Sequence, residues 1–148
     1  MLKPKKSLKI MDIWSMNRLS AVVTHIEGEQ SLHIISFEYE GIPLKMMGLD
    51  LPRGLHVNAH VTLGVKPSHV AIAKNVNGQL SYSNQLPATI MSIENGKLLS
   101  NILLHVKGSD VQSFITASSA LRMNLQVGDE VTLLMKASEL FVLDVLNV

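Results

Sequence analysis

The sequence predicts an all-β protein built from two tandem five-stranded barrel units. One block of residues occurs twice along the chain, and its strand-like segments are short, rich in β-branched residues and separated by turn residues. The composition agrees, because 47% of the 148 residues are hydrophobic and only 17% are charged. Such a chain has enough apolar side chains for a packed core and too few charges for an intrinsically disordered protein.

The repeat consists of two matched blocks. The block that begins at Asn17 recurs at Asn84, an offset of 84 − 17 = 67, whereas the block that contains Lys66 recurs around Lys136, an offset of 136 − 66 = 70. The second copy therefore contains three additional residues between its blocks. The expected divisions are an N-terminal extension, a first unit, a linker rich in Asn, Gly and Ser, and a second unit, at residues 1–13, 14–77, 78–83 and 84–148.

Each unit is expected to contain about five short strands and little helix, which is typical of a small barrel of the OB type. Turn residues at Gly28-Glu29 and Asn95-Gly96 separate the first strand of each unit from the second. Four strand segments can be bounded in each unit: residues 19–27, 31–39, 43–47 and 61–72 in the first, and 86–94, 98–107, 111–116 and 131–142 in the second.

One segment of the second unit predicts a short helix. Thr116 is a suitable N-cap, and Leu121 and Leu125 follow at helical spacing. The first unit has the shorter segment 48–55 in this place, which contains a proline and is expected to lack the helical turn. This difference accounts for the three additional residues of the second unit.

Composition and motifs argue against several classes of function. The absence of cysteine excludes disulfides and thiolate metal sites, and no nucleophile motif, Gly-rich phosphate loop or HExxH motif indicates an enzyme or a catalytic cofactor. His56 and His60 can share a strand face, but their counterparts in the second unit are not histidines, which argues against a shared metal site. A net charge of +1 and six aromatic residues do not make a nucleic-acid platform.

The cellular location is expected to be the cytoplasm. No apolar run approaches the roughly 18 residues that span a bilayer, so we expect no membrane insertion. The N-terminal segment opens with basic residues, but Lys9 and Asp12 interrupt the apolar core that a signal peptide needs.

Two matched lysines are the first candidates for a binding site. If residues 61–72 and 131–142 are continuous strands, period-two alternation places Ser68 beside Lys66 and Ser138 beside Lys136. An ammonium group and a hydroxyl on one face supply donors that suit an oxyanion. Exposed charges that keep sheet edges from pairing are an equally good explanation of both lysines.

Two further groups of donors lie in the second unit. The first turn of the predicted helix combines free N–H groups with hydroxyls at Thr116 and Ser119, although simple capping also explains the threonine. Ser81 and Ser83 stand where the linker meets the first strand of the second unit, and a flexible joint explains them equally well.

Four motifs of the second unit resemble the molybdate-binding Mop domain, which is also called TOBE. The pattern of that family runs roughly S-x-R-N-Q-L-x-G, I-T-x-x-S-A, L-x-x-G-x-x-V and K-A-S. The matching segments here are SYSNQLPA at 81–88, ITASSA at 115–120, LQVGDEV at 125–131 and KAS at 136–138. Two joined units resemble the tandem proteins called molbindins, as well as the C-terminal domains of molybdate-responsive regulators and molybdate-importer ATPases.

The resemblance implies OB-like units that bind molybdate or tungstate at interfaces between units or subunits. It assigns Thr116, Ser119 and Lys136 to one wall of such a site and Ser81 to the facing wall. Ser83 occupies the position of the family's arginine, which removes one positive charge. Molybdate is a tetrahedral dianion that presents only acceptors at neutral pH, so donors without carboxylates suit it.

The first unit departs further from the family pattern. Lys66 matches the family's lysine, but Trp14 and Met16 stand where serine and arginine are expected, and the T-x-x-S turn is missing. The first unit is therefore expected to be mostly scaffold.

The sequence thus predicts a cytoplasmic, non-enzymatic protein that binds molybdate or tungstate for storage, homeostasis or sensing. The resemblance implies a homo-oligomer, either a trimer or a dimer, and a molybdate transporter or regulator as a possible partner. The alternative is a regulatory or structural interaction module of such a transporter or regulator, in which the anion sites have decayed. An OB-type nucleic-acid binder is disfavoured by charge and aromatic content.

Overall fold

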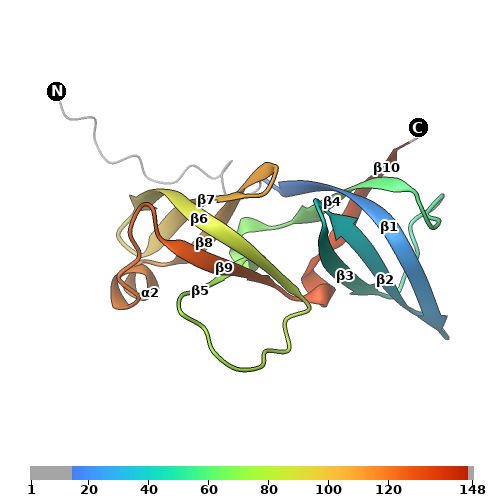
Figure 1. The fold of residues 1–148 in the computed structure, drawn as a ribbon, viewed down its shortest axis with the longest axis horizontal. Coiled ribbons are helices and arrows are strands. Elements are labelled where there is room, and N and C mark those ends of the chain that lie inside the picture. Colours follow the sequence, from blue (N-terminus) through green and yellow to red (C-terminus); the bar gives the residue numbers. More distant parts are fainter. Residues whose placement is uncertain (1–14, 147–148) are drawn as a thin grey trace.

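A computed structural model describes residues 15–146 and contains two five-stranded antiparallel sheets, each curled into a small barrel (Figure 1). The prediction of an all-β fold with two barrel units and at most a short helix in each is confirmed. The described residues contain no helix long and apolar enough to cross a membrane. The helical elements are η1 (Pro67–His69), α2 (Ala117–Arg122) and η2 (Ala137–Glu139).

The two sheets have the same topology. The first has the strand order β10-β4-β1-β2-β3 and the second the order β5-β9-β6-β7-β8. The strands of the first sheet are β1 (Asn17–Glu29), β2 (Leu32–Tyr39), β3 (Ile42–Gly48), β4 (His60–Val65) and β10 (Phe141–Leu146). Those of the second are β5 (Ala71–Ala73), β6 (Asn84–Asn95), β7 (Leu99–Val106), β8 (Ser109–Thr116) and β9 (Glu130–Met135).

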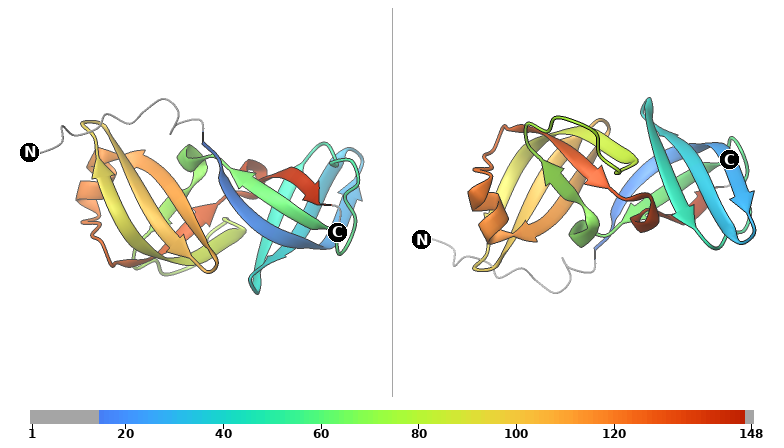
Figure 2. Two further views of the ribbon diagram at one scale, coloured as in Figure 1. Left: turned by 90° about the horizontal axis from the view of Figure 1, so that it is seen from above. Right: turned by 90° about the horizontal axis from the view of Figure 1, so that it is seen from below.

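Each barrel takes its closing strand from the other half of the sequence. β10, at the end of the chain, pairs antiparallel with β4, and β5 pairs antiparallel with β9. Figure 2 shows both crossings, with the red β10 in the barrel of β1 to β4 and the green β5 in the barrel of β6 to β9. The predicted ranges 14–77 and 84–148 describe the repeat in the sequence, but neither barrel is built from one of these ranges alone.

The crossings begin where each closing segment breaks. Residues 61–72 and 131–142 were expected to be continuous strands, and this expectation is wrong, since β4 ends at Val65 and β9 at Met135. A 3₁₀ turn follows each strand end, and its first position in the first half is Pro67, whose fixed φ and missing N–H suit the start of a helical turn. The lysine and serine therefore do not alternate on one strand face.

A pair of equivalent asparagines joins the two barrels. Asn84, the first residue of β6, is fully buried; its Nδ2 donates to the Lys45 carbonyl at 2.9 Å and its Oδ1 accepts from the Lys45 N–H at 2.7 Å. Asn17, the first residue of β1, makes the same two bonds with Gln112, both 2.8 Å long. Each asparagine thus extends one barrel onto the free edge strand of the other, β3 or β8.

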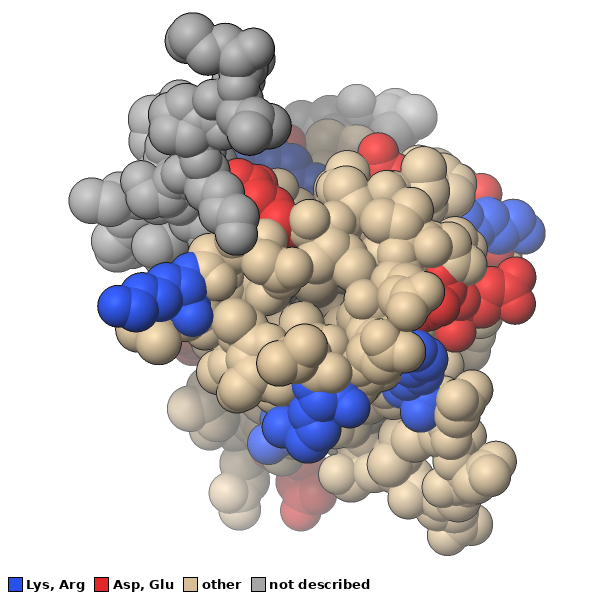
Figure 3. Space-filling view, turned by 90° about the vertical axis from the view of Figure 1, so that its left-hand side faces the viewer, with Lys and Arg blue, Asp and Glu red and all other residues tan. Residues whose placement is uncertain are grey.

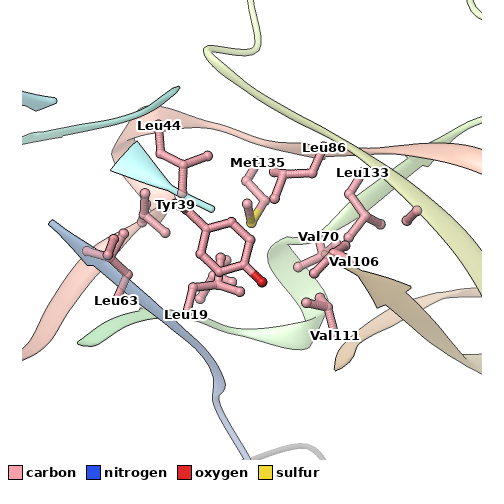
Figure 4. Packing of buried hydrophobic residues seen from close by; sticks show 14 of the residues in the cluster. Leu19, Tyr39, Leu44, Leu63, Val70, Leu86, Val106, Val111, Leu133 and Met135 are labelled. Atoms are coloured by element: carbon pink, nitrogen blue, oxygen red, sulfur yellow. The ribbon is translucent and has the colours of Figure 1, made fainter. Parts of the chain in front are cut away.

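The hydrophobic core continues from one barrel into the other. Tyr39, Leu63 and Leu19 of the first barrel belong to the same buried cluster as Leu86 and Leu133 of the second (Figure 4). The Tyr39 hydroxyl crosses the boundary and donates to the Lys107 carbonyl, and burial raises the pKa of Tyr39 above 10.0. The two barrels therefore form one packed body.

Lys74, which directly follows β5, fastens this crossing strand to the second barrel. Its Nζ donates to the Asn124 carbonyl at 2.9 Å and lies 3.0 Å from Oδ2 of Asp129. The same carboxylate oxygen accepts from the Gln126 N–H at 2.9 Å. This backbone bond, and then the Lys74 ammonium, hold the pKa of Asp129 below its usual value of 3.8.

Replacing Lys74 with methionine is expected to destabilise the protein more at neutral pH than in acid. A carboxyl group with a depressed pKa contributes stability above its unfolded pKa, and this contribution is lost as the pH falls through the folded value. We expect the stability difference between the variant and the parent to shrink below about pH 4. Urea unfolding at neutral pH and near pH 3 measures it, and an equal difference at both pH values would contradict the assigned ion pair.

Candidate functional site

A surface hollow of about 290 Å³ lies where the two halves of the sequence meet. It contains one of the predicted site residues, Lys136, and is called the Lys136 hollow below. The first half contributes the segment around η1, and the second half contributes the linker, β8 and the segment around η2. The lining residues are Ser68, His69, Val70, Ala71, Tyr82, Phe114, Ile115, Lys136 and Glu139.

A buried hydrogen bond and a strand pairing hold the walls of the Lys136 hollow. The Ser113 hydroxyl donates to the Val70 carbonyl at 2.6 Å, which fixes the chain after η1 against β8. On the other side, Asn84 pairs with Met135 as the last ladder pair of β6 and β9. Lys136 therefore leaves the sheet beside the start of β6, and Ser83 precedes β6 at the same end.

The hollow combines charges of both signs. Lys136 is exposed and brings an ammonium group, while Nδ1 of His69 lies 2.7 Å from Oε2 of Glu139. Both members of this pair are partly exposed, with 37% of each side chain accessible. Ser68 and Tyr82 add hydroxyl groups. The hollow can therefore bind an anion with Lys136, but the carboxylate of Glu139 opposes it.

The second predicted group of donors lies on α2, apart from this hollow. Thr116 is the N-cap, as predicted, and its Oγ1 accepts from the Ser119 N–H at 3.2 Å and donates to the Ser119 Oγ at 2.8 Å. The Arg122 guanidinium donates to the same Ser119 Oγ at 3.4 Å. Capping thus accounts for Thr116, and neither Thr116 nor Ser119 lines the Lys136 hollow.

The remaining predicted residues are dispersed and exposed. Lys66 precedes η1, Ser138 lies on η2, and Ser81 and Ser83 lie in the linker segment. None of these four residues lines the Lys136 hollow. Trp14, which stands at the sequence position of the family's serine, lies outside the described residues.

Charges at the end of the molecule that carries α2 are also dispersed. Figure 3 shows Lys and Arg side chains separated from one another around the edge of this face, with uncharged residues between them. A nucleic-acid surface requires basic residues that cluster or follow a stripe. The described residues that Figure 3 shows on this face form no such cluster.

The sequence reasoning missed His69, Glu139 and Tyr82. A signal for the first two was present, because 139 − 69 = 70 is the offset that also relates Lys136 to Lys66. His69 and Glu139 are therefore equivalent positions of the repeat. Equivalent positions meet where two repeats pack around a pseudo-twofold axis, but the repeat alone did not indicate where that axis lies.

The second half of the sequence matches a known domain family, and the fold agrees with the match. Residues 80–142 match the TOBE domain family, and these residues include β6 to β9, α2 and the Lys136 segment. The suspected resemblance to tandem TOBE proteins is thereby confirmed for the second half, and the duplicated strand topology agrees with it.

The chain is similar in sequence to curated proteins and in fold to solved structures. The chain is 34% identical over 85 residues to the molybdenum import ATP-binding protein ModC of Brucella abortus, and equally to ModC of Brucella suis and Brucella melitensis. The match covers 57% of this chain and 24% of the relative, so the chain spans about a quarter of the length of these curated relatives.

Among solved structures, the chain is similar to the cytoplasmic molybdate-binding protein ModG with molybdate bound. The TM-score is 0.80 at 21% identity, over 85% of this chain and 94% of that chain. This likeness shows that the two proteins share a fold of two joined barrels. A molybdate-binding protein from Sporomusa ovata is 36% identical over 45% of this chain and all of its own length, with a TM-score of 0.44.

Proposed function

We propose that the protein is a non-enzymatic, cytoplasmic oxyanion-binding protein that binds molybdate or tungstate for storage, homeostasis or sensing. The observation that carries the proposal is the Lys136 hollow, which residues of the matched TOBE domain line together with residues 68–71 of the first half. The names of the relatives support it, because ModG is a molybdate-binding protein and ModC is a molybdenum import protein. The match covers only 24% of ModC, so the ATP-binding function in the name of ModC is not proposed for this chain.

The chemistry of the hollow agrees with a tetrahedral dianion. The Lys136 ammonium donates charge-assisted hydrogen bonds, and the hydroxyls of Ser68 and Tyr82 are further donors. Thr116, Ser119 and the linker residues Ser81 and Ser83 lie outside the hollow, and a second copy of the chain could bring such donors to it. We therefore propose a homo-oligomer, a trimer or a dimer, which light scattering of the purified protein at several concentrations tests.

Replacing Lys136 with methionine is expected to weaken molybdate binding about tenfold, because it removes the charged donor of the hollow. Isothermal titration with molybdate, tungstate and sulfate measures the affinity of parent and variant. The matched control is Lys66→Met, since Lys66 occupies the same repeat position and does not line the hollow. Equal weakening by both substitutions would contradict the assigned site.

One feature favours a second function, a regulatory or structural interaction module of a molybdate transporter or regulator. Glu139 places a carboxylate inside the hollow, and Ser83 leaves the neighbouring linker without a positive charge. The same titration separates the two functions. Binding heat with molybdate or tungstate supports oxyanion binding, whereas no heat with any of the three anions supports the interaction module.

A further inference from the structure

We propose that His69, which comes from the first half of the sequence, is a binding residue of the Lys136 hollow and makes oxyanion binding depend on pH. This inference rests on the proposed function and adds a residue that the sequence motifs do not contain. Its geometric basis is the contact between His69 and Glu139 at 2.7 Å, inside the hollow that Lys136 also lines.

The charge of the hollow depends on the protonation of His69. With a neutral imidazole, the Glu139 carboxylate offsets the Lys136 ammonium, so the three groups sum to zero. When His69 is an imidazolium, it forms an ion pair with the Glu139 carboxylate, and the charges of His69, Glu139 and Lys136 sum to +1. A dianion is repelled by an unpaired carboxylate and attracted by a net positive charge, so protonation of His69 favours its binding.

The imidazole also gains a donor on protonation. Nδ1 faces Glu139, and Nε2 has no partner among the described residues. A neutral imidazole has one donor nitrogen, whereas an imidazolium has two. The second N–H is then available to an oxyanion in the hollow.

The other charged or titratable groups that line the hollow with His69, among the described residues, are Glu139, Lys136 and Tyr82. Glu139 approaches from η2, Lys136 precedes η2, and Tyr82 comes from the linker. The neighbouring part of β8 contributes Phe114 and Ile115, which carry no charge. Histidine is the side chain whose charge ordinarily changes between about pH 5 and pH 8, and His69 is the one histidine among the described residues that line the hollow.

The expected result is molybdate binding that is about fivefold to tenfold tighter at about pH 6 than at about pH 8, a modest factor because the pair is partly exposed and screened by solvent. Titration calorimetry at both pH values measures the ratio. His69→Gln is neutral at both, so its ratio is expected to fall to about one. Glu139→Gln removes the carboxylate, so its affinity at about pH 8 is expected to reach that of the parent at about pH 6.

The matched control is His105→Gln. Nδ1 of His105 lies 2.9 Å from Oδ1 of Asp110 in another exposed histidine–carboxylate pair, outside the hollow. This variant is expected to keep the pH dependence of the parent. Because all variants are titrated with the same molybdate solution, protonation of the ligand affects each of them equally. Thermal unfolding of each variant confirms that it is folded.

The outcomes separate this inference from the proposed function. No binding by the parent at either pH overturns the proposed function itself. Binding with equal affinity at both pH values, or a His69→Gln variant that keeps the parent's ratio, overturns the role of His69 and leaves oxyanion binding intact. A Glu139→Gln variant that binds no more tightly than the parent at the higher pH also overturns it.

Discussion

Replacing Asn84 with alanine is expected to lower the free energy of unfolding by roughly 2–4 kcal/mol. The substitution removes both hydrogen bonds that join the start of β6 to Lys45 on β3 of the other barrel. It leaves the Lys45 N–H and carbonyl without partners next to a cavity, because Asn84 is fully buried. Urea unfolding followed by circular dichroism measures the loss.

Asn101→Ala is the matched control for this prediction. Asn101 is also a buried asparagine, 8% exposed, but its Oδ1 has no hydrogen-bond partner among the described residues. Its replacement therefore removes volume and leaves no backbone group unpaired, so we expect a loss of about 1 kcal/mol. A loss for Asn84→Ala that is no larger than the loss for Asn101→Ala would show that the asparagine does not join the barrels.

Replacing Gly64 with valine is expected to cost about 1–3 kcal/mol and to loosen the closing strand of the first barrel. A Cβ atom at Gly64 would lie 2.7 Å from Cγ of Leu143 and 3.1 Å from Cε2 of Phe141, both on β10. These distances are shorter than van der Waals contact, so the side chains of Leu143 and Phe141 must move, which disturbs the packing of β10 on β4. Hydrogen exchange of residues 141–146 is expected to become faster than in the parent.

Gly48→Val provides the control for the strand itself. Gly48 ends β3, and a Cβ atom added there would have no heavy atom within 4 Å. We expect a change within about 0.5 kcal/mol and no change in the exchange of β10. If Gly64→Val leaves the exchange of residues 141–146 unchanged, the close fit of β10 on Gly64 is not what holds the strand.

Gly64 also shows how the crossing strands fit their own partners. Its repeat counterpart is the buried Leu134, since 64 + 70 = 134. Gly64 stands opposite the large Phe141 of β10, whereas Leu134 stands opposite the small Ala71 of β5. Because large and small residues are paired in both ladders, β5 and β10 are not interchangeable. The two halves of the chain are thus complementary rather than identical.

Local features of the sequence determined the class of the fold and much of its secondary structure. The repeat offsets, the strand-like segments and the N-cap at Thr116 depend on neighbouring residues along the chain, and the structure reproduces them. The first half has turns and irregular chain instead of a helix between β3 and β4, as the proline-containing segment 48–55 predicted. The motifs of residues 81–138 also predicted the TOBE domain.

Only the tertiary structure decided which strands close each barrel and which residues share the candidate site. A period-two pattern indicates which face of a strand is buried, but it does not indicate the partner strand. The pattern of β10 is compatible with pairing to β9 of its own half and equally with pairing to β4 of the other half. The break at Pro67 and its counterpart at Ala137 send both closing strands across the molecule. That exchange brings His69 to Glu139 and places both beside Lys136, a contact that depends on the packing of distant segments and not on local pattern.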